Sequence, residues 1–387
     1  MRAMRLRMVL LSLLILLAAG CGGGIAIAPA PPSSPVAACV PASPFEFAYV
    51  LNGYAVLMYT VDSCTGALTP ATPASIPTGT TPQEIGAEGM VAAPSGQFVY
   101  VANIVSNASD EATISMYTVN SSTGVLTPTS PATIPTGFYP QGITIDPSSK
   151  FVYTANSDDN TVSMFIISSG TGVLTPTSPA TVATGWSPDA VTVHPSGKFA
   201  YAVNQDDGTI SMYTLNSSTG VLTPMTPATV PTGISPFGIT VDPSGKFAYV
   251  PDAYDERNVV SQYTIDPTTG ALTPNTPATA GTGNQPTAIA VDPSSQFAYL
   301  VNRADNTVWT YTIDPTTGNL TSRSTIATGY EPFHVAVDPT GKFVYVTDES
   351  GEVSIYAIGS DGTLTPAGAV ATGGASALSV AVTGTRQ

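Results

Sequence analysis

The stretch VDPSGKFAYV, residues 241–250, combines a tight turn with the start of a strand. Asp, Pro, Ser and Gly form turns, and the aromatic and β-branched residues after them are typical of a strand. The strand half occurs seven times, as FEFAYVLN (45–52), GQFVYVAN (96–103), KFVYTAN (150–156), KFAYAVN (198–204), KFAYVPD (246–252), QFAYLVN (296–302) and KFVYVTD (342–348). The turns begin at residues 93, 146, 194, 242, 292 and 338, a spacing of roughly 50 residues that indicates a solenoid, propeller or array.

Each repeat contains four short strand patterns. In one copy they are GITVD (238–242), KFAYVP (246–251), VVSQYTID (259–266) and ALTPNTPATAGTG (271–283). The third is apolar on both sides, as expected for a sheet packed between neighbouring sheets. Helical repeats are excluded by this strand composition and by 35 prolines. We therefore predict an all-β, seven-bladed propeller with four-stranded antiparallel blades.

The two ends of the repeat region predict how the ring closes. The first repeat starts at its second strand, whereas the chain ends on ALSVAVTG (377–384), which has the pattern of an inner strand. We expect residues 377–382 to complete the first blade, which would close the ring with both ends of the chain. An open array is the alternative.

The N-terminal region predicts export. Residues 1–20 hold three arginines and then an apolar run of about 12 residues, typical of a signal peptide and shorter than the ~20 residues of a membrane span. The small residues before Cys21 resemble a bacterial lipobox, which implies lipidation of Cys21; an ordinary secreted protein is the alternative. Residues 21–44 are predicted to form a flexible tether and 45–384 the propeller. We expect an outer-membrane lipoprotein, periplasmic or on the cell surface.

The remaining cysteines and the charges limit other functions. Cys39 and Cys64 would lie in an oxidising compartment, so we predict a disulfide between them. The chain has 11 Lys and Arg against 26 Asp and Glu, a net charge of −15, which excludes binding to nucleic acid or to an anionic lipid surface. With two histidines and no metal-binding motif, we expect no metal, no cofactor and a monomer.

The VDPSGKFAYV and YTIDPTTGALTP segments resemble the repeats of the seven-bladed lactonase-type propellers over residues 45–384. In that family an arginine, a histidine and a glutamate make the active site. The resemblance places Arg257 in one arginine position and matches His334 and Glu349 to the histidine and glutamate. Thr287, Ala288 and Arg303 fill the corresponding positions one blade earlier, and Phe333 replaces the arginine beside His334. If the protein is a lactonase, the resemblance therefore implies His334, Glu349 and Arg303 as its catalytic residues.

A second set of candidates lies on one face of the ring. The loops between second and third strands and between blades share this face and vary in sequence, as binding loops do. We expect Asp255, Glu256 and Arg257 to form the rim of a groove that continues through Arg303 and Glu349. Loop aromatics on the same face are binding candidates or seam covers: Trp186, Tyr330 and Phe333. The Asn or Asp that ends each second strand either lines a cation-binding mouth or closes its turn.

Two functions follow from these features. The main prediction is a non-enzymatic binding or scaffold module in the cell envelope, with a protein, peptide, glycan or small lactone bound on the loops and membrane contact only through the lipid. The alternative is a lactonase-family hydrolase, similar to 6-phosphogluconolactonase, acting on a sugar or other lactone. Convergence of Arg257, Arg303, His334 and Glu349 at one mouth would favour the enzyme.

Overall fold

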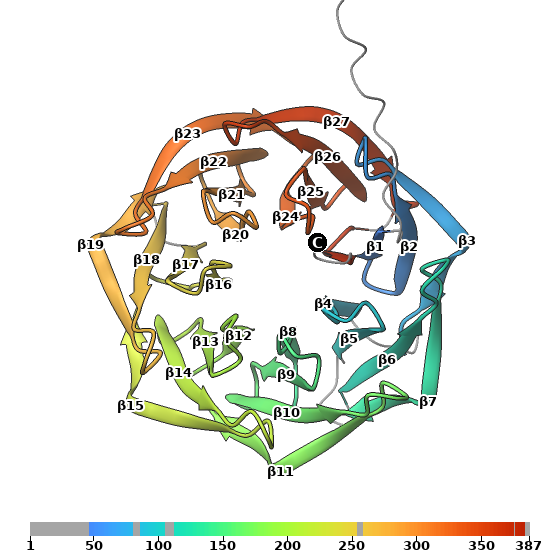
Figure 1. Ribbon diagram of the computed structural model, residues 1–387, viewed down its shortest axis with the longest axis horizontal. Helices are drawn as coiled ribbons and strands as arrows, with labels where there is room; N and C mark the ends of the chain where they lie inside the picture. Colours follow the sequence, from blue (N-terminus) through green and yellow to red (C-terminus); the bar gives the residue numbers. More distant parts are fainter. Residues whose placement is uncertain (1–45, 80–85, 105–111, 254–257, 375, 384–387) are drawn as a thin grey trace, which may run out of the picture. The chain divides into compact units, whose positions relative to one another are not determined.

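The computed structural model describes residues 46–79, 86–104, 112–253, 258–374 and 376–383. Within these residues all regular secondary structure is β-strand, arranged as seven four-stranded antiparallel sheets around a ring (Figure 1). The predicted all-β, seven-bladed propeller is confirmed. None of the described residues forms a helix able to cross a membrane.

In every blade the strands follow one another outwards from the centre of the ring. Blade 1 contains β28 (Ser379–Thr383), β1 (Glu46–Leu51), β2 (Ala55–Val61) and β3 (Leu68–Pro77). Blade 2 contains β4 (Gly86–Ala92), β5 (Phe98–Ile104), β6 (Thr113–Val119) and β7 (Leu126–Pro135). Blade 3 contains β8 (Pro140–Ile145), β9 (Phe151–Asn156), β10 (Thr161–Ile167) and β11 (Leu174–Ala183). Blade 4 contains β12 (Pro188–Val193), β13 (Phe199–Asn204), β14 (Thr209–Leu215) and β15 (Leu222–Pro231).

The other three blades repeat this order. Blade 5 contains β16 (Thr240–Val241), β17 (Phe247–Asp252), β18 (Val259–Ile265) and β19 (Leu272–Gly281). Blade 6 contains β20 (Pro286–Val291), β21 (Phe297–Asn302), β22 (Thr307–Ile313) and β23 (Leu320–Ala327). Blade 7 contains β24 (Pro332–Val337), β25 (Phe343–Asp348), β26 (Glu352–Ile358) and β27 (Leu364–Ala371).

The last strand of the chain closes the ring, as the end patterns predicted. β28 pairs antiparallel with β1, with Ser379 opposite Leu51 and Thr383 opposite Phe47. Val380 is 3% exposed, so this strand also contributes to the core. Blade 1 is therefore built from both ends of the repeat region.

Buried tyrosines tie neighbouring blades together. The tyrosine of each second strand is fully buried, and its hydroxyl donates to a glycine carbonyl in the outer turn of the next blade. Tyr153 donates to Gly220 at 2.8 Å, and Tyr345 donates to Gly66 at 3.0 Å across the closing seam between blades 7 and 1. Gly66 has φ of 73°, and an added Cβ would lie 2.5 Å from Phe343, so this turn requires glycine.

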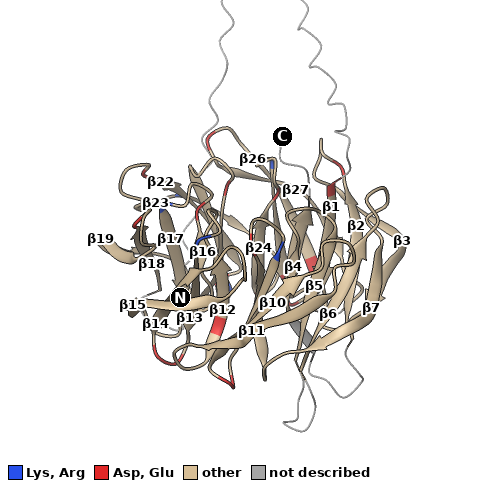
Figure 2. Cartoon of the chain, turned by 60° about the horizontal axis from the view of Figure 1, so that its bottom comes forward, with Lys and Arg blue, Asp and Glu red and all other residues tan. Residues whose placement is uncertain are grey.

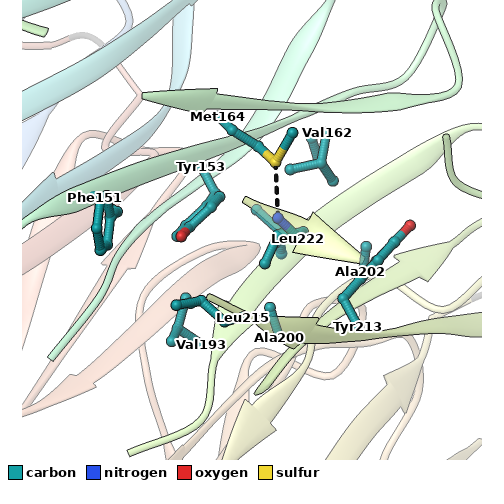
Figure 3. Packing of buried hydrophobic residues seen from close by; sticks show 12 residues of the cluster. Phe151, Tyr153, Val162, Met164, Val193, Ala200, Ala202, Tyr213, Leu215 and Leu222 are labelled. Atoms are coloured by element: carbon teal, nitrogen blue, oxygen red, sulfur yellow. Dashed lines mark hydrogen bonds between the residues drawn. The ribbon is translucent and has the colours of Figure 1, made fainter. Parts of the chain in front are cut away.

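The seams are also filled by apolar side chains of the third strands. Figure 3 shows the seam between blades 3 and 4, where Phe151, Tyr153 and Met164 pack against Tyr213 and Leu215. The backbone N–H of Leu222 donates to the sulfur of Met164 at 3.2 Å. This packing between blades explains why the third strands are apolar on both sides.

The loop face, defined here by the loops between second and third strands and those between blades, is ordered by side-chain hydrogen bonds. Asn204 donates to Thr209 and Ser211, each at 2.9 Å. Asp252, its counterpart in blade 5, accepts from the Gly233 N–H at 3.1 Å and from Ser261 at 2.8 Å. These side chains close turns, which is the second of the two interpretations given to this position in the sequence.

Candidate functional site

Three charged side chains of blades 6 and 7 meet on the loop face, and we call them the rim cluster: Arg303, Glu331 and Glu349. The Nε and a terminal nitrogen of Arg303 donate to Glu331 Oε2 at 3.2 and 2.9 Å. Arg303 also forms an ion pair with Glu349 Oε1. The three side chains are 25–32% exposed, so solvent reaches the cluster but does not surround it.

Backbone contacts hold each member of the rim cluster. The N–H of Arg303 donates to the Gln285 carbonyl at 2.9 Å, and the N–H of Glu349 donates to the Tyr330 carbonyl at 3.2 Å. Glu331 has φ of 51°, and its N–H donates to Asn306 Oδ1 at 2.7 Å. The same loop position has positive φ in the four preceding blades, at Tyr139, Ser187, Ser235 and Gln285. A conformation common to the repeat thus presents a carboxylate only in blade 7 among these loops.

The pKa values of the two carboxyl groups of the rim cluster are shifted in opposite directions. The hydrogen bond from the Tyr330 hydroxyl, assisted by Arg303, lowers the pKa of Glu331. Burial raises the pKa of Glu349, against the lowering effect of Arg303. The proximity of the two carboxyls acts in the same directions. Glu331 is therefore the stronger acid of the two carboxyls.

The inner strands enclose a central cavity of about 220 Å³. Its lining includes Gln141, Asp189, Phe237, Thr287, Phe333 and His334. Glu331 lies two residues before Phe333, so the rim cluster and the cavity wall belong to one continuous segment of blade 7.

His334 is half-buried at this cavity and lies opposite Thr347 in the β24–β25 pair. Its Nδ1 atom is buried and has no hydrogen-bond partner among the described residues. Burial lowers the pKa of His334 from 6.5 to about 4, so the imidazole is neutral at neutral pH.

The sequence-predicted residues divide into three groups. Arg303 and Glu349 are in direct contact, and His334 lines the central cavity beside Phe333. Tyr330 is 59% exposed and Trp186 68% exposed, and neither lines the cavity. Asp255, Glu256 and Arg257 lie outside the described residues, so the groove expected there stays a prediction.

Glu331 was missed by the sequence reasoning. It lies in TGYEPFH, aligned with TGFYPQG, TGWSPDA, TGISPFG and TGNQPTA, where the same slot holds Tyr139, Ser187, Ser235 and Gln285. An acidic residue at a slot that is uncharged in the other four loops was a readable signal. In the sequence analysis this segment was used for Tyr330, Phe333 and His334, and not for Glu331.

The structure describes only one of the three cysteines for which predictions were made. Cys64 is disulfide-bonded. Cys21 and Cys39, the other two cysteines of the chain, lie outside the described residues, so the pairing with Cys39 and the lipidation of Cys21 stay predictions.

A larger cavity, about 690 Å³, lies on the opposite face among the short turns of blades 5 to 7. Its charged lining residues are Lys246 and the exposed ion pair of Arg323 with Asp361, 2.8 Å apart. It brings together no pair of carboxyls and no histidine, so we place the candidate site at the rim cluster and the central cavity. In the described part of the chain, no group of three or more His, Cys, Asp and Glu side chains is arranged to hold a metal ion.

The fold and the site define a seven-bladed propeller with an acid–base cluster at one mouth. The sequence pattern of the Lactonase family, described as a 7-bladed beta-propeller, matches residues 45–185, 176–280 and 273–382. The chain belongs to this lactonase family. Comparison with curated protein sequences finds no match.

Solved structures of related folds include three lactonase-type proteins. A putative 6-phosphogluconolactonase from Bacteroides fragilis aligns with TM-score 0.70 and 20% identity, covering 87% of this chain and 97% of that one. A putative 6-phosphogluconolactonase from Bacteroides uniformis aligns with TM-score 0.68 and 20% identity, covering 87% of this chain and 99% of that one. A periplasmic gluconolactonase from Pseudomonas aeruginosa aligns with TM-score 0.67 and 18% identity, covering 88% of this chain and 99% of that one. At these identities the structural likeness establishes the fold.

These findings correct the main functional prediction. The chain was expected to be a non-enzymatic binding or scaffold module, and this is contradicted by its membership of the lactonase family; the alternative, a lactonase-family hydrolase, fits better. The prediction gave weight to the incomplete match with the family site, in which Phe333 takes the place of the arginine beside His334. In the structure, Arg303 of the neighbouring blade contacts Glu349.

Proposed function

We propose that the protein hydrolyses a lactone at the rim cluster and the central cavity. The observation that carries this proposal is that Arg303 holds two carboxyls whose pKa values are shifted in opposite directions, next to a cavity lined by a neutral histidine. Lactone opening needs a base for water, a cation for the oxyanion and an acid for the leaving oxygen. The rim cluster contains one group suited to each task.

The proposed reaction assigns a role to each member of the cluster. Glu331, ionised, takes a proton from water as the water oxygen bonds to the lactone carbonyl carbon. The guanidinium of Arg303 stabilises the negative charge on the former carbonyl oxygen. When the acyl C–O bond breaks, the ring oxygen takes a proton from Glu349, and the product is a hydroxy acid. A proton then passes from Glu331 to Glu349 through solvent, which restores the starting state.

His334 serves this reaction by binding. Its neutral ring lines the cavity and packs against the bound substrate.

The first test is hydrolysis of glucono-δ-lactone by the full chain, followed by proton release. Glu349→Gln and Glu331→Gln are each expected to lower kcat by about 10²–10⁴-fold, the usual cost of removing a general acid or base. Arg303→Gln is expected to lower it by about 10²-fold or more. The wild-type rate is expected to rise with pH through the lowered pKa of Glu331 and to fall through the raised pKa of Glu349, giving a bell-shaped profile.

The ion pair on the opposite face supplies the matched control. Arg323→Gln removes an arginine–carboxylate contact of 2.8 Å that is remote from the cavity, and it is expected to leave kcat unchanged. A wild-type protein that does not accelerate lactone hydrolysis, or a Glu349→Gln variant with the wild-type rate and pH profile, would overturn the proposal.

We also propose that the protein is exported and lipidated at Cys21. The support is the signal-type pattern of residues 1–20 and the periplasmic gluconolactonase among the proteins of similar fold. Cell fractionation with labelled palmitate tests this: a Cys21→Ser variant should lose the label, and an unlabelled cytosolic wild type would refute it.

A further inference from the structure

The central cavity has an aromatic wall. Phe237 of blade 5 and Phe333 of blade 7 meet edge to face, with ring centroids 5.6 Å apart and planes at 88°. Thr287 of blade 6 lies between these strands, and its hydroxyl donates to the Phe333 carbonyl at 3.1 Å. The wall is therefore held in place by the blade between its two rings.

Small residues at the other inner strands allow neighbouring inner strands to approach closely around the cavity. The pairing register places Gly89, Ala190, Ala288 and Ser379 at the position that His334 occupies in blade 7. Gly142 and Gly238 fill it in the remaining blades by sequence. An added Cβ on Gly89 would lie 2.4 Å from the Gln141 carbonyl oxygen, and one on Gly142 would lie 2.7 Å from the Ala190 Cα. His334 is thus the one large side chain at this level, and the space left is below the roughly 300–1,000 Å³ of pockets for drug-sized ligands.

The charge around the cavity disfavours a phosphate group. No Lys or Arg is among its lining residues, which include Asp189. In the described part of the loop face the cation is Arg303, and it already contacts two carboxyls. The four lysines lie in the turns of the opposite face, and Arg257 lies outside the described residues. Arg303 can stabilise the single charge that develops on an oxyanion, but with two carboxyls beside it the cluster has no net positive charge to offset the lost hydration of a dianionic group.

We infer that the site accepts neutral lactones that carry an apolar substituent, and that Phe237 and Phe333 select them. This inference rests on the proposed function and adds the substrate class. The lactone ring lies at the rim cluster, and the substituent packs against the aromatic wall. Phe333 follows Glu331 by two residues, at most about 7 Å of chain, so one small molecule spans both. Phosphorylated sugar lactones are rejected.

The test compares two substrates with the full chain: δ-nonalactone, which carries a butyl group, and 6-phosphoglucono-δ-lactone. We expect kcat/KM for δ-nonalactone to be at least about tenfold higher. Phe237→Ala is expected to lower kcat/KM for δ-nonalactone by about tenfold or more, while the value for glucono-δ-lactone changes by less than about threefold. Phe333→Arg is expected to reverse the preference. Phe138→Ala removes an aromatic that is 40% exposed and outside the cavity lining, and it should change neither value.

Binding separates this inference from the proposed function. The probe is 6-butylpiperidin-2-one, the lactam counterpart of δ-nonalactone, titrated by calorimetry. Binding that Phe237→Ala weakens supports the aromatic wall even if no lactone is hydrolysed, in which case only the proposed function fails. Preference for the phosphorylated lactone, or lactam binding that is absent or equal in wild type and Phe237→Ala, overturns the substrate class and leaves the hydrolase proposal standing.

Discussion

At the scale of single residues, His334 is exceptional because its blade-to-blade equivalents are glycine, alanine or serine. A buried imidazole with an unpaired nitrogen reduces the stability of the protein, since nothing within the fold replaces the water it loses. Burial likewise raises the pKa of Glu349, although the ion pair with Arg303 acts in the opposite direction.

His334 should make the protein sensitive to acid. Its pKa is lowered from 6.5 to about 4 in the fold, so the unfolded chain binds a proton between these values and the folded chain does not. Stability is therefore expected to fall as the pH drops through 6.5 towards 4. A shift of one pKa unit corresponds to 1.36 kcal/mol. Between pH 7 and pH 4.5, the free energy of unfolding of His334→Gln should therefore fall by about 2 kcal/mol less than that of the wild type. Urea unfolding at the two pH values measures this, and an equal loss in both proteins would contradict it.

At the scale of elements, the blades are joined by hydroxyl groups placed by the repeat. In five blades the tyrosine of the third strand donates to the last carbonyl of the preceding blade, as Tyr213 does to Ala183 at 2.7 Å. Blade 3 has Phe165 at this position, 3% exposed. The carbonyl of Pro135, at the end of β7, is the one that such a tyrosine would reach.

Phe165→Tyr is expected to stabilise the protein. The added hydroxyl would donate to the Pro135 carbonyl, as its equivalents do in other blades, and contribute about 1 kcal/mol to the free energy of unfolding. The reverse change in blade 4, Tyr213→Phe, is expected to cost about 1–3 kcal/mol, because the Ala183 carbonyl loses its partner. Chemical denaturation of the two variants checks both values. A destabilised Phe165→Tyr variant would show that the seam of blade 3 has no room for the hydroxyl.

The strands were predictable because the same sequence pattern occurs in all seven repeats. Turn residues, double-sided third strands and an unpaired inner strand at the C-terminus were enough for the blade count and the closure, although β28 begins at Ser379 rather than residue 377. The site was less accessible, because it depends on contacts between blades. The sequence distance from Arg303 to Glu349 says nothing about their ion pair, which comes from the ring geometry. The central cavity could be foreseen only by aligning Gly89, Ala190, Ala288 and Ser379 with His334.

At the scale of the whole propeller, charged residues are scarce, at 10% of the chain. Figure 2 shows acidic and basic residues scattered over a largely uncharged ring. With a net charge of −15, the chain repels anions in general, and a single arginine held by two carboxyls changes this little. The charge of the whole chain therefore agrees with the preference for neutral substrates inferred at the cavity.

Ring closure should make the C-terminal strand indispensable. Ending the chain after Ala377 removes β28, exposes the edge of β1 and leaves the buried Val50 and Leu51 without their inner neighbour. We expect a loss of about 5 kcal/mol or more, comparable with the whole stability of a typical domain. Ending it after Thr383 keeps the strand and should have little effect. Soluble yield and urea unfolding of the two truncated proteins measure this, and cooperative unfolding of the shorter one at the wild-type midpoint would contradict it.

The pairing of β1 with β28 also sets an order of events during synthesis. About 330 residues separate the start of β1 from the start of β28, so at roughly 5–20 residues per second β1 waits tens of seconds for its partner. Blades 2 to 6 are complete before that, while the first strand to emerge still has an open edge. A nascent chain that ends prematurely has no means of sealing this edge, and only a fully translated polypeptide yields a finished ring.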